Sequence, residues 1–116
     1  MISDPTPYAD PVIELAEIAR ALAHPGRIRI LEILASHNSC FCGQIVDQLP
    51  LSQSTVSQHL RELKRVGLIQ GKIAGPHTCY CLDHEMLNRA HDRFLAMFKG
   101  LDCCRPPENQ GETYAL

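Results

Sequence analysis

The sequence predicts a mainly α-helical domain with one small β-hairpin. Apolar residues recur every three or four positions in several stretches, which is the period of amphipathic helices. Two short segments, residues 68–73 and 77–82, flank a Gly75-Pro76 turn signal and predict the hairpin. The chain has 116 residues, which is enough for one domain with a single hydrophobic core.

The first two helices are predicted by apolar stripes on either side of a break. Residues 1–10 are expected to form a flexible arm. Apolar residues at helical spacing then begin at Pro11, and proline is well suited to the first turn of a helix. The His24-Pro25-Gly26 segment ends this helix, and a second helix follows until the polar stretch 36–39. Its predicted buried stripe is Ile28, Leu31, Ile33 and Leu34.

The middle of the chain predicts a short helix, a tight turn and a longer helix with a polar face. Residues 40–42 are a short segment in which cysteine and phenylalanine alternate. Residues 43–49 predict a short helix that ends at Pro50. Ser52 is a good N-cap for a helix over 53–66, and Gly67 stands where a C′ glycine ends it. Two such helices followed by a hairpin predict a winged helix-turn-helix.

The last helix is predicted over residues 84–101, with Asp83 as its N-cap. Its apolar stripe is Leu87, Ala90, Phe94, Met97, Phe98 and Leu101. This stripe is too wide for a monomer of 12.9 kDa to cover easily, which favours a homodimer, although the same residues can instead complete the monomer core. The domain is therefore expected over residues 11–102, followed over 103–116 by a cysteine pair and a disordered tail.

The start of the 53–66 helix is rich in groups that read DNA. Side chains at the exposed start of a helix can enter the major groove, where amides and hydroxyls bond to base edges and cations hold phosphates. Residues 51–77 carry a net charge of +3, whereas the rest of the chain carries −5. The residues predicted to contact double-stranded DNA are Ser52, Gln53, Ser54, Thr55, Ser57, Gln58, His59, Arg61, Lys64, Arg65, Lys72 and His77.

Several segments resemble the ArsR/SmtB family of arsenical and metal-sensing repressors. Residues 51–69, LSQSTVSQHLRELKRVGLI, look like its recognition helix, and residues 22–31, LAHPGRIRIL, are similar to the opening of its second helix. Cys40-Phe41-Cys42 resembles its cysteine motif, and the resemblance covers about residues 12–101. It implies a homodimer joined by the first and last helices, which binds an inverted-repeat operator and releases it when an inducer binds.

The six cysteines fall into three pairs, and thiols are expected rather than disulfides because no export signal is visible. Close thiolates suit a soft ion such as a trivalent arsenical, arsenite or methylarsenite. The family's usual third thiol is absent after Cys40 and Cys42. The vicinal pair Cys103 and Cys104 is therefore the first candidate for the inducer, with Cys40 and Cys42 second, and a composite site across the dimer interface is an alternative. Cys79 and Cys81 are expected mainly to pack, with a ligand role as the alternative.

Two other triggers fit the same fold. Oxidation of the thiols can replace the arsenical, which defines a redox-sensing repressor. A zinc or cadmium sensor is the other alternative, since Asp83, His84, His91 and Asp92 lie on the last helix, where the family places such a site, but with a different spacing. An enzyme is disfavoured because a CxxC motif and a nucleophile–base set are both missing. With no apolar run long enough to span a membrane, the protein is expected in the cytoplasm, and the DNA-bound form is expected to need no cofactor.

Overall fold

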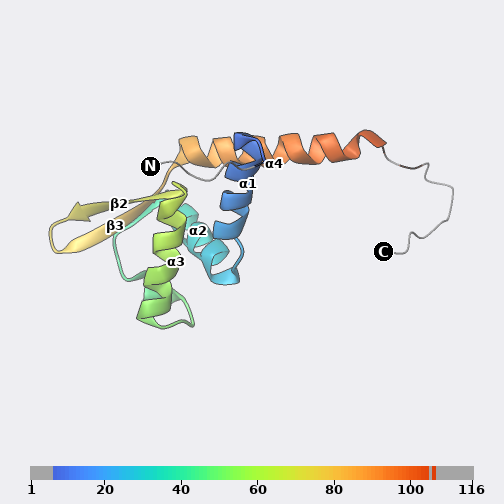
Figure 1. The fold of residues 1–116 in the computed structure, drawn as a ribbon. Coiled ribbons are helices and arrows are strands. Elements are labelled where there is room, and N and C mark those ends of the chain that lie inside the picture. Colours follow the sequence, from blue (N-terminus) through green and yellow to red (C-terminus); the bar gives the residue numbers. More distant parts are fainter. Residues whose placement is uncertain (1–6, 105, 107–116) are drawn as a thin grey trace.

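The structure is a computed structural model that describes residues 7–104 and 106 of the chain. It confirms the mainly α-helical winged helix-turn-helix. In Figure 1, the last helix lies across the top of the molecule and runs past the other helices, while the β-hairpin projects on the opposite side. The elements are α1 (Asp10–Ala21), α2 (Pro25–Ser36), β1 (Cys40–Phe41), η1 (Ile45–Gln48), α3 (Gln53–Arg65), β2 (Ile69–Ala74), β3 (His77–Leu82), α4 (His84–Leu101) and η2 (Asp102–Cys104).

Three of the four α-helices begin at a side-chain cap. Ser52 Oγ accepts a hydrogen bond from the backbone N–H of Thr55 at 3.3 Å, and Asp83 Oδ1 accepts one from Met86 at 3.1 Å. Both caps confirm the sequence prediction, and each contributes about 0.5–2 kcal/mol relative to alanine. His24 caps α2 through Nδ1. Gly67 follows α3 at a φ of 84°, which an L side chain rarely adopts, so it fits the predicted C′ position.

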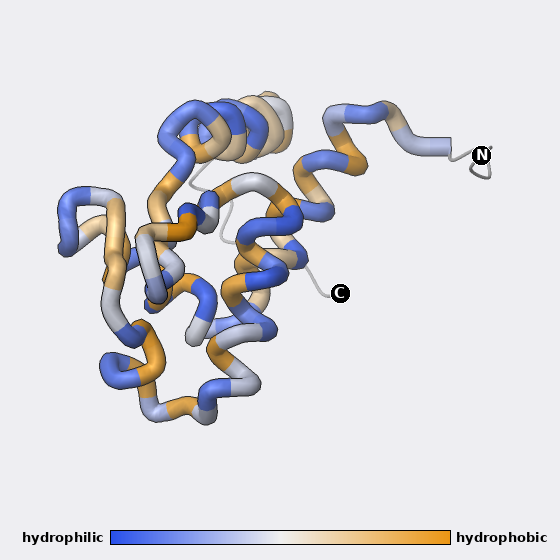
Figure 2. The backbone as a smooth tube through the Cα atoms, turned by 90° about the vertical axis from the view of Figure 1, so that its left-hand side faces the viewer, coloured by the Kyte–Doolittle hydropathy of each residue, from blue (hydrophilic) through white to orange (hydrophobic). Residues whose placement is uncertain are grey.

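The core lies where α2, α3 and the base of the hairpin meet. Its fully covered side chains include Ile30 and Leu34 from α2, Leu63 from α3 and Ile69 from β2. Each such side chain contributes about 1.5–3 kcal/mol through burial. Ile28, predicted to be buried, is instead exposed, because the buried face of α2 follows positions 26, 30, 33 and 34. Figure 2 shows apolar and polar segments alternating along the helices, as this one-sided burial requires.

The sheet has three antiparallel strands in the order β1-β3-β2. The predicted hairpin β2–β3 is confirmed, with Gly75 at a φ of 62° in its turn. The third strand is a difference from the prediction, because β1 pairs with β3 in the register Cys40↔Cys81. The predicted helix over 43–49 is only the 3₁₀ turn η1. Leu49 precedes Pro50 and is extended at a ψ of 142°, since proline disfavours the helical conformation of the residue before it.

Charged side chains tie α1 to the two helices beside it. The carboxylate of Glu14 accepts hydrogen bonds from Arg89 Nε at 2.7 Å and from a second nitrogen of the same guanidinium at 2.8 Å. Arg93 Nε donates to the same carboxylate at 3.3 Å. These partners lower the pKa of Glu14, with the Arg89 hydrogen bond as the largest cause. A bidentate pair of this kind fixes orientation, so it holds α1 against the first half of α4.

Candidate DNA-binding interface and cysteine sites

The start of α3 presents a dense set of hydrogen-bonding groups at an exposed end of the molecule. Ser52, Gln53, Ser54 and Gln58 are exposed, whereas Val56, Leu60 and Leu63 on the other face are buried in the core. Gln53 Nε2 donates to Ser57 Oγ at 3.2 Å, so the two side chains are already oriented along one face. The helix is thus anchored by its apolar face and offers its polar face outward, as a helix that enters a groove requires.

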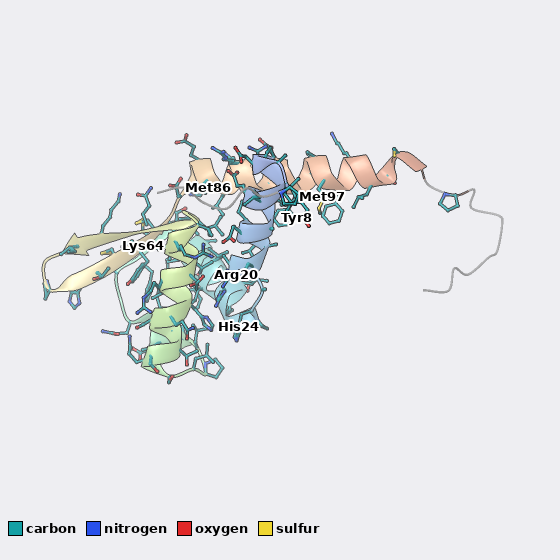
Figure 3. The ribbon with its side chains drawn as sticks, viewed as in Figure 1. Tyr8, Arg20, His24, Lys64, Met86 and Met97 are labelled. Carbon is teal, nitrogen blue, oxygen red and sulfur yellow. A yellow bond between two sulfur atoms is a disulfide. The ribbon has the colours of Figure 1, made fainter. Side chains whose placement is uncertain are left out.

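Cationic side chains flank this polar face on the side of the hairpin. Arg61, Lys64 and Lys72 are exposed and form no ion pair with any residue that the structure describes. Figure 3 shows Lys64 at the end of α3 that lies next to the hairpin. Their charges are therefore available to phosphate groups, which is where most of the affinity for DNA originates.

A cleft of about 270 Å³ separates α3 from the hairpin. Gln53, Ser57 and Leu60 line it from α3, and His77 and Tyr80 line it from β3. Beyond the cleft the hairpin carries the predicted contacts Lys72 and His77, both exposed. Ile73, near the turn, is 87% exposed and is available for contact with a partner surface. The hairpin thus lies beside α3 and forms a second part of the same candidate interface.

Arg65 has a different role from its neighbours on α3. It donates to Glu17 on α1 at 2.8 Å and to Glu62 one turn earlier at 3.1 Å. These two carboxylates raise the pKa of Arg65, with the Glu17 hydrogen bond as the largest cause. The predicted phosphate contact is therefore already paired within the protein, because Glu17, 48 residues away in sequence, packs beside it.

His59 corrects the sequence analysis, which assigned it to DNA. Only 4% of the residue is exposed, and its Nδ1 accepts a hydrogen bond from Arg27 Nε at 3.1 Å. Its ring lies 4.3 Å from that of His24, between centroids. Burial, followed by the nearby His24 and Arg27 charges, lowers the pKa of His59. His59 shares the buried face of α3 with Val56 and Leu63, so it joins α3 to α2 instead of reaching DNA.

Four of the six cysteines lie together on the sheet. Disulfides join Cys40 to Cys81 and Cys42 to Cys79. The expectation of free thiols at Cys40 and Cys42 therefore differs from the structure. Cys79 and Cys81 are buried, as their expected packing role requires, but each is also disulfide-bonded. The cause is the third strand: β1 lies against β3 with Cα atoms only 4.1 Å and 4.0 Å apart at the two pairs. The sequence signal for this pairing was the presence of two CxC segments, because each places two cysteines on one face of a strand.

The third cysteine pair lies at the far end of α4. Cys103 is exposed in the 3₁₀ turn η2, which continues α4 directly. The side chain of Cys104 and the predicted disordered tail over 105–116, apart from residue 106, lie outside the described residues. Most of the predicted N-terminal arm lies outside them as well.

Two of the four residues considered for a zinc site on α4, Asp83 and His84, have hydrogen-bond partners outside that set. Asp83 caps the helix and also accepts a hydrogen bond from Gln70 at 2.7 Å. His84 Nε2 lies 2.7 Å from Ser39 Oγ, and His91 pairs with Asp92 at 3.6 Å. Within the described part of the chain, no three His, Cys, Asp or Glu side chains form a metal site as they stand. Likewise, no helix among these residues is long and apolar enough to cross a membrane.

A polar-faced helix, a flanking cationic surface and a neighbouring hairpin define a DNA-binding protein of the winged helix-turn-helix class. Comparison with known proteins agrees. Residues 24–70 match the model described as "Bacterial regulatory protein, arsR family". The chain is 36% identical over 92 residues to the HTH-type transcriptional regulator CmtR of Mycobacterium tuberculosis, covering 79% of this chain and 77% of that protein. The chain therefore belongs to the arsR family of bacterial regulatory proteins, and it is a DNA-binding transcriptional repressor and not an enzyme.

Two further similarities concern ligand and assembly. The arsenical resistance operon repressor of Staphylococcus xylosus is 32% identical over 75 residues, covering 65% of this chain and 71% of that protein. A solved homodimeric winged helix-turn-helix DNA-binding domain from Mycobacterium bovis, a possible ArsR-family regulator, has the same fold, with a TM-score of 0.61 at 19% identity. That match covers 93% of this chain and 100% of the other.

Proposed function

We propose that the protein is a homodimeric repressor that releases an inverted-repeat operator when a trivalent arsenical binds its cysteine thiolates. The observation that supports DNA binding is the exposed polar start of α3 beside the cations Arg61, Lys64 and Lys72, which form no ion pair among the described residues. In this proposal α3 enters the major groove, Gln53 and Ser57 meet base edges, and the cations hold phosphates. It acts in the cytoplasm, where the operator is.

An apolar surface at the end of α4 supports the homodimer. Phe98 is 60% exposed and Leu101 is 71% exposed, and Leu95 lies exposed on the same helix. Val12, on α1, is exposed as well. Figure 1 shows that this half of α4 extends beyond the other helices, so the described part of the protomer leaves it uncovered. A second copy that packs α1 and α4 against these residues buries them and places two α3 helices on successive major grooves, about 34 Å apart.

The position of Cys103 supports the first-ranked inducer site. It lies exposed in η2, directly after the apolar half of α4 that the proposed dimer buries. An arsenical bound by Cys103 and Cys104 sits beside this interface, so binding can shift the relative position of the two protomers and of their α3 helices. Thiolates prefer soft ions of this kind. The name of the Staphylococcus xylosus relative, an arsenical resistance operon repressor, points to the same class of ligand.

A pair of cysteine variants tests which thiols respond. An operator is first selected from random DNA, and arsenite-induced release is followed in an excess of a phosphine reductant, which reduces disulfides without offering competing thiols. Cys103→Ser with Cys104→Ser is expected to bind the operator normally and to resist release. The matched control, Cys40→Ser with Cys42→Ser, is expected to remain responsive. If the control fails to respond while the Cys103/Cys104 variant is released, the second-ranked pair holds the inducer.

The two disulfides favour one alternative, a repressor that senses oxidants. In this function, oxidation of Cys40, Cys42, Cys79 and Cys81 to disulfides changes operator affinity without any arsenical. The same reductant separates the two functions, because release by arsenite while every thiol is kept reduced cannot depend on oxidation. Arsenite-insensitive binding that changes only with the redox state identifies the oxidant sensor instead.

A further inference from the structure

Four cysteines occupy one patch of the small sheet, which we call the four-cysteine cluster: Cys40 and Cys42 on the β1 side, Cys79 and Cys81 on β3. Residues two apart on a strand share a face, and the register Cys40↔Cys81 sets the two CxC segments side by side. Phe41 and Tyr80, at the positions between them, pack towards the core. All four sulfur atoms therefore belong to the same face of the sheet.

The cluster is open on one side. Cys40 is exposed on the edge strand β1, and Cys42, just after this strand, is exposed as well, whereas Cys79 and Cys81 are only 7% and 8% exposed in the central strand. Each disulfide thus has one exposed cysteine, at which a small dithiol can begin thiol–disulfide exchange. Two dithiol molecules supply the four electrons and four protons that convert the two disulfides into four thiols, and each dithiol becomes a disulfide.

We propose that the reduced four-cysteine cluster is a tetrathiolate site for a tetrahedral, thiophilic divalent ion, either cadmium or zinc. A tetrahedral zinc ion with zinc–sulfur bonds of about 2.3 Å needs sulfur atoms about 3.8 Å apart, and the larger cadmium ion accepts a slightly wider spacing. Paired Cα atoms at 4.1 Å and 4.0 Å are closer than most cross-strand pairs, so they bring the sulfurs of each pair within that spacing. The two pairs are next-but-one neighbours along the strands, and side chains that lean along a strand can close the remaining gap.

The surroundings favour thiolates over thiols. Binding of the ion displaces four protons and leaves a site with a net charge of −2. Lys72 is the residue paired with Cys79 on β2, so its ammonium group belongs to the same face. Gln70, paired with Cys81, adds an amide to that face. A neighbouring lysine stabilises thiolates, and four thiolates exclude hard cations in favour of soft ones.

The site is distinct from the arsenical site proposed at Cys103 and Cys104, and it joins the two parts of the DNA interface. From Cys42 the chain passes directly through Gly43 and Gln44 into η1, which precedes α3. Cys79 belongs to β3 of the hairpin, and Cys42 also lines the cleft between the hairpin and α3. An ion held by both segments therefore fixes the hairpin relative to the recognition helix.

The test uses the full-length protein with Cys103→Ser and Cys104→Ser, so that only the cluster carries thiols. The reduced protein is titrated with cadmium, and the ultraviolet thiolate-to-cadmium charge-transfer band and the mass of the native complex are recorded. One cadmium per protomer and protection of all four cysteines from alkylation are expected. Adding Cys79→Ala and Cys81→Ala is expected to weaken binding more than about 100-fold, since even the loss of an outer-shell partner costs about 10- to 100-fold.

A second variant keeps the test decisive if the first variant misfolds. Cys40→Ser with Cys42→Ser changes exposed residues only, and it is expected to lose cadmium affinity to the same extent while circular dichroism stays unchanged. The proposal is overturned if either variant keeps full affinity, or if cadmium protects only two cysteines from alkylation. Arsenite-induced release from the operator is measured separately on the wild-type protein, so failure of the cluster and failure of the proposed repressor function give different results.

Discussion

Two sets of charged side chains, one between α1 and α4 and one on the outer face of α3 and the hairpin, differ in their use. Glu14 holds Arg89 and Arg93, so charges between α1 and α4 are satisfied within the protomer. Arg61, Lys64 and Lys72 face outward without an ionic partner among the described residues. Paired charges fix helix orientation, whereas unpaired ones of a single sign attract a charged partner. The location of these outward-facing cations therefore indicates the proposed DNA-binding surface better than the net charge of −2 does.

The largest expected effect concerns the uncovered end of α4. Phe98→Asp places a carboxylate in the proposed dimer interface and is expected to produce monomers in sedimentation experiments. Operator affinity is expected to fall at least about 100-fold, because two linked half-sites bind about 10²–10⁴-fold better than one. Asn88→Asp, an equal change of charge at another exposed position of α4, is the control. A dimeric Phe98→Asp protein contradicts the proposed interface.

A smaller effect is expected at the start of α3. Gln53→Ala removes an amide that is proposed to read a base edge, and the loss of such a contact costs about 1–3 kcal/mol of discrimination. Operator binding and binding to unrelated DNA are compared at equal salt, and only the first is expected to weaken. Ser57→Ala tests the neighbouring contact, since Gln53 is hydrogen-bonded to Ser57. Equal losses on both DNAs would mean that these residues contact phosphates only.

The outward-facing cations are expected to act on every DNA sequence alike. Lys64→Ala is expected to reduce the slope of the logarithm of affinity against the logarithm of salt concentration by about 1, which is the signature of one lost phosphate contact. Arg29→Ala on α2 is the matched control, because Arg29 is exposed but lies 3.6 Å from Glu32. An unchanged slope for Lys64→Ala, or an equal change for Arg29→Ala, contradicts the division between outward and paired charges.

The smallest expected effect concerns His59, which links α3 to α2. Its lowered pKa means that the folded protein keeps His59 neutral at a pH where the unfolded chain, with a pKa near 6.5, takes up a proton. The free energy of unfolding is therefore expected to fall as the pH drops below about 6.5. In His59→Gln, whose amide oxygen can still accept from Arg27, this loss is expected to be smaller. Denaturant unfolding at pH 7.5 and 5.5 measures the difference, and equal losses contradict the assignment.

Short-range sequence patterns predicted the individual helices and the hairpin. They did not predict contacts between segments that are distant in the sequence. Ser52, Gly67 and Asp83 act through their own helices, so caps and ends could be predicted from neighbouring residues. The buried position of His59 was also present in the sequence, because it lies three residues after Val56 and four before Leu63 on the buried face. Its polar side chain led to the wrong assignment.

The features that were not predicted from the sequence depend on tertiary contacts. The disulfide partners are separated by 41 and 37 residues, and a strand of two residues such as β1 gives too short a pattern to predict its pairing. The Arg65–Glu17 pair likewise depends on how α1 packs against α3. The polar face of α3 was predictable because it depends on one helix, whereas the four-cysteine cluster depends on two segments meeting.

The central claim is that an arsenical releases this repressor from its operator. The most direct measurement is the fluorescence anisotropy of a labelled operator bound to the wild-type protein, titrated with arsenite in excess phosphine reductant. The account predicts that anisotropy falls to the value of free DNA as arsenite saturates the thiols, and that zinc leaves the complex intact. Operator binding that stays unchanged at saturating arsenite, with the thiols reduced throughout, would contradict it.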